Sequence, residues 1–140
     1  MAALYEYDPL PSTGVHFRLL EYEANQYTEL MTFRLAVKEL PLDNRTSLDY
    51  TALSYTWAED EPSHKIIVND SLFSISQNLY GFLLEWRSSR DGPALLWIDA
   101  VCINQEDLEE RASQVRYMQQ LFRGARNVIA WLGLAHRQAT

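Results

Sequence analysis

The sequence contains one cysteine, Cys102, among 140 residues, so no disulfide can form within the chain. A lone cysteine is typical of a reducing compartment, and we expect a cytoplasmic protein. The sequence also has no run of about 18 apolar residues, so we predict no membrane span. Its first ten residues, MAALYEYDPL, lack the charged and apolar regions of a secretory signal. These absences favour a cytoplasmic globular domain.

Glycine and histidine are too scattered to form the common ligand motifs. The five glycines stand at positions 14, 81, 92, 124 and 133, so the chain has no glycine-rich phosphate loop. The three histidines have no metal-ligand spacing with each other or with Cys102, and we expect neither a metal nor a cofactor. A Cys–His nucleophile pair stays open, because such partners are distant in sequence, although a lone cysteine after a strand is more often simply buried.

Positive charge is scarce. The chain has 12 Lys and Arg against 19 Asp and Glu, a net charge of −7, which disfavours the broad basic surface that nucleic-acid binding needs. The imbalance belongs to one half of the chain. Residues 1–62 carry 11 acids and four bases, whereas residues 63–140 carry eight of each. The acidic first half is therefore a candidate interface.

Length and composition predict one domain over residues 1–140, because 47% hydrophobic and 22% charged residues are ordinary for a globular fold. Apolar alternation predicts strands near residues 15–20, 33–37 and 52–57. Asn69-Asp70 predicts a tight β-hairpin between residues 65–68 and 72–75. Ser76 is a candidate N-cap for a helix whose inward positions are Leu79, Phe82, Leu83 and Trp86.

The rest of the chain alternates between buried strands and a helix. Residues 94–98 and 127–133 are nearly continuous apolar runs, typical of strands covered on both faces. Between them we predict a helix over residues 107–125, with an inward apolar stripe of Leu108, Ala112, Val115, Met118 and Phe122. Strand and helix in alternation favour an α/β fold with a mainly parallel sheet flanked by helices. The chain ends soon after the last strand, which suggests a part of a longer protein.

Ligands of open α/β sheets bind beyond the carboxyl ends of the strands, and two such ends here carry polar residues. One end holds Ser54, Tyr55 and Trp57. The other holds Asp99, followed by Cys102, Asn104 and Gln105. A carboxylate directly after a buried strand needs a partner, so Asp99 either faces a ligand or accepts hydrogen bonds from its own loop.

Helical periodicity points to two charged residues beside that end. Arg111 lies about 40° from the centre of the apolar stripe, and Glu110 lies about 140° away. We therefore predict an exposed Glu110 and an Arg111 that pairs with Asp99. The alternatives for Arg111 are a side chain that extends to solvent or one that pairs with Asp107.

Several ordered motifs resemble the fungal heterokaryon-incompatibility (HET) domain. The run Tyr50-Thr-Ala-Leu-Ser-Tyr-Thr-Trp57 is similar to its opening motif, although Ala58 stands where that family usually has glycine. The run Leu96-Trp-Ile-Asp-Ala-Val-Cys-Ile-Asn-Gln105 resembles its most distinctive block. Further matches are Asn78-Leu79, Glu110-Arg111, Gln114-Val115, Met118 and residues 125–133. Leu10-Pro11 and Phe17-Arg-Leu-Leu20 also look like the usual lead-in of that family, so the resemblance covers nearly the whole chain. Residues 50–133 are the motif-bearing core, and residues 1–49 are a β-rich N-terminal extension.

The resemblance implies a cytosolic domain that triggers cell death when incompatible fungal strains fuse, attached to a regulatory or sensor region. It also implies a remote kinship with Toll/interleukin-receptor (TIR) domains, a flavodoxin-like fold and homo-oligomers. Some TIR domains cleave NAD with a helical glutamate, for which Glu110 is the positional match. In that hypothesis NAD is the substrate and no cofactor is needed, Asp99 and Arg111 shape the site, and Tyr55 or Trp57 stacks on a ring. The alternative is a non-catalytic adaptor that self-associates and recruits a death effector.

Overall fold

The computed structural model describes residues 4–40, 49–55, 61–89 and 94–131. They form a mixed sheet of seven strands in the order β5-β4-β2-β1-β6-β3-β7, with helices around it. The elements in chain order are β1 (His16–Glu23), β2 (Thr32–Glu39), β3 (Tyr50–Tyr55), β4 (Pro62–Val68), β5 (Ser71–Ser76), α1 (Gln77–Ser89), β6 (Leu95–Ile98), α2 (Asp99–Cys102), α3 (Leu108–Gly124) and β7 (Asn127–Trp131).

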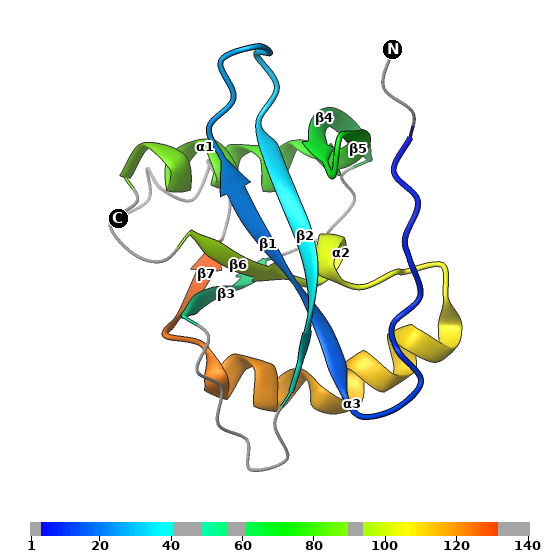
Figure 1. Ribbon diagram of the computed structural model, residues 1–140. Coiled ribbons are helices and arrows are strands. Elements are labelled where there is room, and N and C mark those ends of the chain that lie inside the picture. Colours follow the sequence, from blue (N-terminus) through cyan, green and yellow to red (C-terminus); the bar gives the residue numbers. More distant parts are fainter. Residues whose placement is uncertain (1–3, 41–48, 56–60, 90–93, 132–140) are drawn as a thin grey trace.

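Strands β6, β3 and β7 form a parallel group at one side of the sheet, and β2 and β4 also pair parallel. β3 lies between the other two, with β6 on one side and β7 on the other. The chain runs from β3 to β6 and then crosses to the opposite side of β3 to form β7. Right-handed crossovers then place the two connecting helices on opposite faces. Figure 1 shows this arrangement, with α1 and α3 on either side of the three strands. The predicted alternation of strand and helix is confirmed for this half of the chain.

The prediction of a mainly parallel sheet is wrong. β1 pairs antiparallel with both β2 and β6, and β4 pairs antiparallel with β5. The predicted N-terminal extension over residues 1–49 contributes β1 and β2 to the middle of the sheet. Residues 17–20 are all buried, since neighbouring strands and helices cover β1 on both faces. The alternation of residues 15–20 predicted the strand but not its central position.

The predicted hairpin and the first predicted helix are confirmed. Asn69 and Asp70 have φ of 49° and 68°, the left-handed pair that a two-residue hairpin turn requires. Ser76 Oγ accepts a hydrogen bond of 3.1 Å from Leu79 N and caps α1. The inward positions of α1 are buried as predicted, namely Leu79, Phe82, Leu83 and Trp86.

The bounds predicted for α3 are confirmed, and Met118 and Phe122 of its predicted inward face pack against the core, but the first part of that face is wrong. Leu108 and Val115 are 74% and 56% exposed, whereas Glu110, Gln114 and Leu121 are buried. The reason lies on β1, where Arg18 attracts Glu110 and the His16 carbonyl accepts a hydrogen bond of 2.7 Å from Gln114 Nε2. Polar partners therefore set the rotation at the start of this helix, while Leu121 and Phe122 pack against the core further along.

The last strand also differs from its prediction. β7 lies at the edge of the sheet beside β3, and none of its residues is buried, with Val128 51% exposed. Trp131 still packs inward, because its ring lies edge-on to Phe82 and its Nε1 donates a hydrogen bond to Asn78. In the described part of the chain no helix is long and apolar enough to cross a membrane.

Candidate functional site

An arginine–glutamate pair is buried at the carboxyl end of β6. Arg18 Nη1 lies 2.7 Å from Glu110 Oε2, and Arg18 Nη2 lies 2.8 Å from Glu110 Oε1. The two residues are only 2% and 9% exposed. Arg18 comes from β1 and Glu110 from the first turn of α3, so the bidentate pair joins segments that are 92 residues apart.

The remaining hydrogen-bonding capacity of the pair is directed to the backbone. Glu110 Oε2 accepts a bond of 2.6 Å from Asn104 N, while Arg18 donates to the carbonyls of Cys102 and Asp8 at 3.1 and 2.9 Å. Burial alone would lower the pKa of Arg18, but its hydrogen bonds and attraction to Glu110 outweigh burial and raise that pKa. The pair therefore stays charged and ties four segments together.

Local sequence explains why α3 begins where it can present Glu110. Asp107 is the N-cap, and its Oδ1 accepts a bond of 3.1 Å from Glu110 N. The loop before it is held by Asn104, whose Oδ1 accepts from Glu106 N at 3.2 Å. The cap and the loop thus place the Glu110 carboxylate next to the backbone N–H of Asn104, just after the end of α2.

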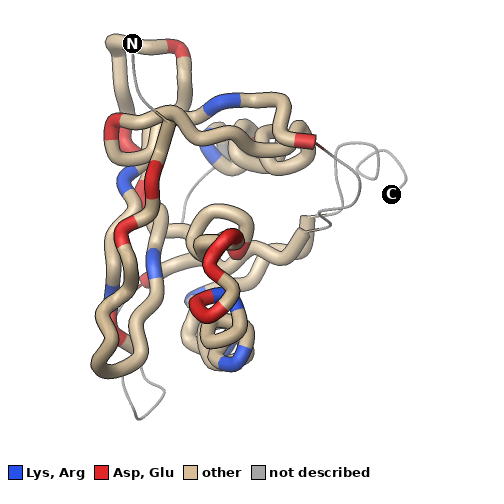
Figure 2. Tube along the Cα trace, turned by 90° about the vertical axis from the view of Figure 1, so that its right-hand side faces the viewer, with Lys and Arg blue, Asp and Glu red and all other residues tan. Residues whose placement is uncertain are grey.

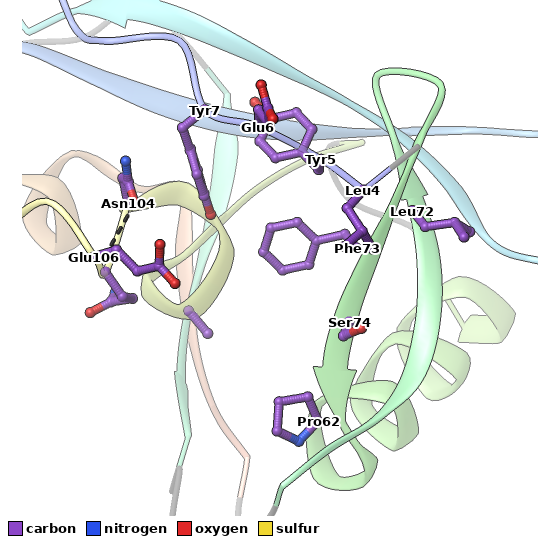
Figure 3. A pocket seen from close by; sticks show the side chains of 12 residues that line it. Leu4, Tyr5, Glu6, Tyr7, Pro62, Leu72, Phe73, Ser74, Asn104 and Glu106 are labelled. Carbon is purple, nitrogen blue, oxygen red and sulfur yellow. Dashed lines mark hydrogen bonds between the residues drawn. The ribbon is translucent and has the colours of Figure 1, made fainter. Parts of the chain in front are cut away.

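A cavity of about 600 Å³ lies on the other side of Tyr7. The Tyr7 ring covers the guanidinium of Arg18 at 4.9 Å and forms one wall of the cavity. Tyr5 and Phe73 complete an aromatic cluster, with ring centroids 4.9 and 6.2 Å from that of Tyr7. Figure 3 shows the Phe73 ring extending from β5 toward Tyr7.

The polar rim of the cavity consists of acids and amides. Glu6 and Glu106 contribute carboxylates, and Asn104 and Gln105 contribute amides. None of the described lining residues is Lys, Arg or His. A phosphate needs such donors, so the cavity suits a neutral or cationic planar group better than a dinucleotide.

Comparison with known proteins connects this chain to one family. The profile described as "Heterokaryon incompatibility protein (HET)" matches residues 50–140. This chain is a member of the heterokaryon incompatibility family. It is 35% identical over 148 residues to "Heterokaryon incompatibility protein 6, OR allele" of Neurospora crassa, and the match covers 94% of this chain but 21% of that protein. The chain thus spans about a fifth of the length of this relative, and no solved structure matches it.

The family match begins at Tyr50, yet the buried pair of this HET domain crosses that boundary. Glu110 lies within the matched residues, whereas Arg18 and Tyr7 precede them. The segment before the family match therefore completes the sheet and supplies the cation that holds α3 in place.

Two of the predicted site residues lie in the cavity, and two others lie apart. Asn104 and Gln105 line the cavity of about 600 Å³. Asp99 and Arg111 line a second cavity of about 230 Å³ against α3, to which Gln105 also contributes. The predicted Asp99–Arg111 pair stays a prediction, and the buried ion pair of this region that sequence reasoning missed is Arg18–Glu110.

Glu110, the predicted catalytic residue, does not line the cavity of about 600 Å³. It is buried, contrary to its predicted exposure. Ser54 and Tyr55 end β3 and line neither of these two cavities. Trp57 lies outside the described residues.

Cys102 is a structural thiol in this domain. Its Sγ accepts a hydrogen bond from Ile98 N at 3.4 Å and donates one to the Leu96 carbonyl at 3.8 Å. Complete burial raises the pKa of the thiol to about 12. A nucleophilic role is therefore disfavoured, and the described residues form no group of three metal-ligating side chains.

Sequence reasoning missed Arg18, Tyr5, Tyr7 and Phe73 as parts of this site. One signal was available for Arg18, because a charged residue between Phe17 and Leu19 in a strand of buried apolar residues needs an acid as partner. For the aromatic residues there was none, since the contact between the N-terminal segment and β5 joins residues that are more than 60 apart.

Proposed function

We propose that this HET domain is a cell-death signalling module of fungal heterokaryon incompatibility that acts by self-association, without catalysis by Glu110. The observation that carries the proposal is the state of the Glu110 carboxylate. Both of its oxygens are engaged by Arg18, and one also accepts from Asn104 N. Three of the about four lone-pair sites of this buried carboxylate are thereby occupied, so it is held in a way that stabilises the fold and is not directed toward a substrate.

The second candidate function is cleavage of NAD at the nicotinamide–ribose bond. A cavity of a size that suits a nucleoside lies next to the pair, which supports this candidate. Against it stands the acidic and amide rim, which offers a pyrophosphate no basic side chain among the described lining residues. The glutamate would also have to leave Arg18 before it reached a sugar.

One experiment separates the two functions. The purified 140-residue chain is incubated with NAD, both dilute and clustered on a multivalent scaffold, and nicotinamide is measured by chromatography. The variants are Glu110→Gln and, as the control, Glu29→Gln, an exposed glutamate between β1 and β2. We expect no nicotinamide above the buffer level from any of them, and a lower unfolding temperature for Glu110→Gln alone.

The hydrolase would be established by a different pattern. Clustered wild-type chain would release nicotinamide, Glu29→Gln would match it, and folded Glu110→Gln would lose at least about a thousandfold in rate, as removal of an essential carboxylate does. That pattern would overturn the proposal of a non-catalytic module.

A further inference from the structure

The outward face of α3 carries an apolar stripe that nothing in the domain covers among the described residues. Leu108 and Val115 are 74% and 56% exposed, and Ala112 between them is also exposed. The spacing i, i+4, i+7 places all three on one face of the helix. The first half of the helix buries Glu110 and Gln114 on its inward side, so these three apolar side chains are left for another surface.

Charges of opposite sign flank this stripe. Glu109 and Arg116 lie on the same side of it, about 80° to 100° around the helix from Leu108. Both are exposed, and neither forms an ion pair with another described side chain. Figure 2, in which the N-terminal end of α3 faces the viewer, shows acidic and basic positions together on this helix.

The hollow of about 230 Å³ lies alongside the stripe. It is bounded by Val115 and Met118 from α3 and by Ile103 from the segment after α2. Arg111 and Asp99 line it as well. An apolar side chain that enters this hollow would extend the surface buried against Val115.

We propose that two copies of this chain pair through the outward faces of α3, antiparallel and about a twofold axis at Ala112. In this register Leu108 packs beside the partner's Val115, and Glu109 lies opposite the partner's Arg116. The twofold axis repeats each contact, which gives two apolar contacts and two ion pairs. Ala112 has the smallest side chain of the stripe and lets the helices approach closely at the axis.

The occupant is a second copy because the face is complementary to itself. One flank of the stripe carries the acid Glu109 and the base Arg116, seven residues apart, and reversal of the helix direction matches the acid of one copy with the base of the other. On the other flank the two copies of Arg111 approach each other, but each lines a hollow that also holds Asp99. This inference rests on the proposed self-association and names the surface that performs it.

Sedimentation velocity of the whole chain over a range of concentrations tests the pairing. Val115→Asp should weaken dimerisation at least about 30-fold, because a carboxylate is buried without a partner. The matched control is Val128→Asp, a valine of similar exposure (51%) on β7, which should leave the dimer unchanged. Glu109→Arg and Arg116→Glu should each weaken it about tenfold, since both symmetry-related pairs become repulsive.

The charge-reversal pair identifies the register. When Glu109→Arg and Arg116→Glu are combined, the attraction returns with the signs exchanged, and affinity should recover to within about threefold of the wild type. A wild-type chain that stays monomeric throughout overturns the interface, and so does a dimer that Val115→Asp leaves intact. A double variant as weak as the singles overturns the register.

Induced expression of the same variants in a fungal host separates this inference from the proposed function. If Val115→Asp is monomeric and no longer kills, both stand. If it is monomeric and still kills, the interface is right and self-association is not the signal. If it dimerises and kills, the α3 interface is wrong while the signalling role stands.

Discussion

Helices α1 and α3 have the same apolar periodicity in the sequence. The apolar face of α1 is buried along its whole length, whereas the first half of the apolar face of α3 is exposed. In α1 the apolar face is buried, with Leu83 fully covered. In α3 Leu108 and Val115 of the apolar face are outward and Glu110 is inward, while Met118 and Phe122 of the same face pack against the core. The difference is the surface that each helix meets, because α3 packs against a strand that carries a buried arginine. Periodicity therefore identifies a helix, and the partner surface decides its rotation.

The largest expected effect comes from removal of that arginine. Arg18→Met should lower the free energy of unfolding by about 3–5 kcal/mol, because Glu110 is left buried and unpaired. The control is Arg34→Met on β2, whose contacts with Glu23 and Asp70 are exposed, and we expect its unfolding curve to stay nearly unchanged. Urea denaturation followed by tryptophan fluorescence measures both.

The rate at which Cys102 is alkylated gives a second measure of the stability lost in Arg18→Met. At pH 8 the thiol is protonated, because burial raises its pKa to about 12. Stability linked to this thiol is fully present below its unfolded pKa and decreases as the pH rises toward the folded value. Reaction at pH 8 therefore requires opening of the α2 region, and Arg18→Met should accelerate it. An unchanged rate and an unchanged urea curve together would mean that the pair does not hold α3 in place.

A leucine in each helix tests the comparison directly. Leu83→Ala should cost about 2–5 kcal/mol through the cavity it leaves, whereas Leu108→Ala should stay within about 0.5 kcal/mol. Leu83 is fully buried and Leu108 is 74% exposed. Thermal unfolding of dilute protein keeps any association through α3 from contributing. If the two substitutions lowered the free energy of unfolding equally, Leu108 would be packed in the core, and the comparison of the two helices would be wrong.

Much of the fold was predictable because it depends on local sequence. Asn69-Asp70 determines the hairpin, and Ser76 and Asp107 mark the starts of the two long helices. The sheet order was not predictable in this way. An alternating pattern shows that residues 15–20 form a strand but does not choose between an edge and the centre. The antiparallel pairing of β1 with β6 joins residues more than 70 apart.

The candidate site likewise has one part that local sequence predicted and one part that depends on contacts between distant residues. Asn104 and Gln105 follow a buried strand, and that local signal led to the cavity that they line. The Arg18–Glu110 pair depends on long-range contact, so periodicity assigned Glu110 to solvent and joined Arg111 to Asp99 instead. A charged residue inside an apolar strand needs a buried partner. A helical wheel of α3 alone does not include that strand, so it cannot predict that Glu110 is the partner.

The smallest expected effects come from the helix caps, where α1 and α3 are alike. Ser76→Ala and Asp107→Ala should each lower the free energy of unfolding by about 1 kcal/mol, because each leaves one backbone N–H at a helix start without its acceptor. Asp107→Ala should cost slightly more, since its carboxylate also faces the positive end of the helix dipole. Glu106→Ala, an exposed neighbour, is the control. If Asp107→Ala proved as costly as Arg18→Met, the N-cap and not the ion pair would hold the start of α3, and the contrast between the two helices would arise from their loops.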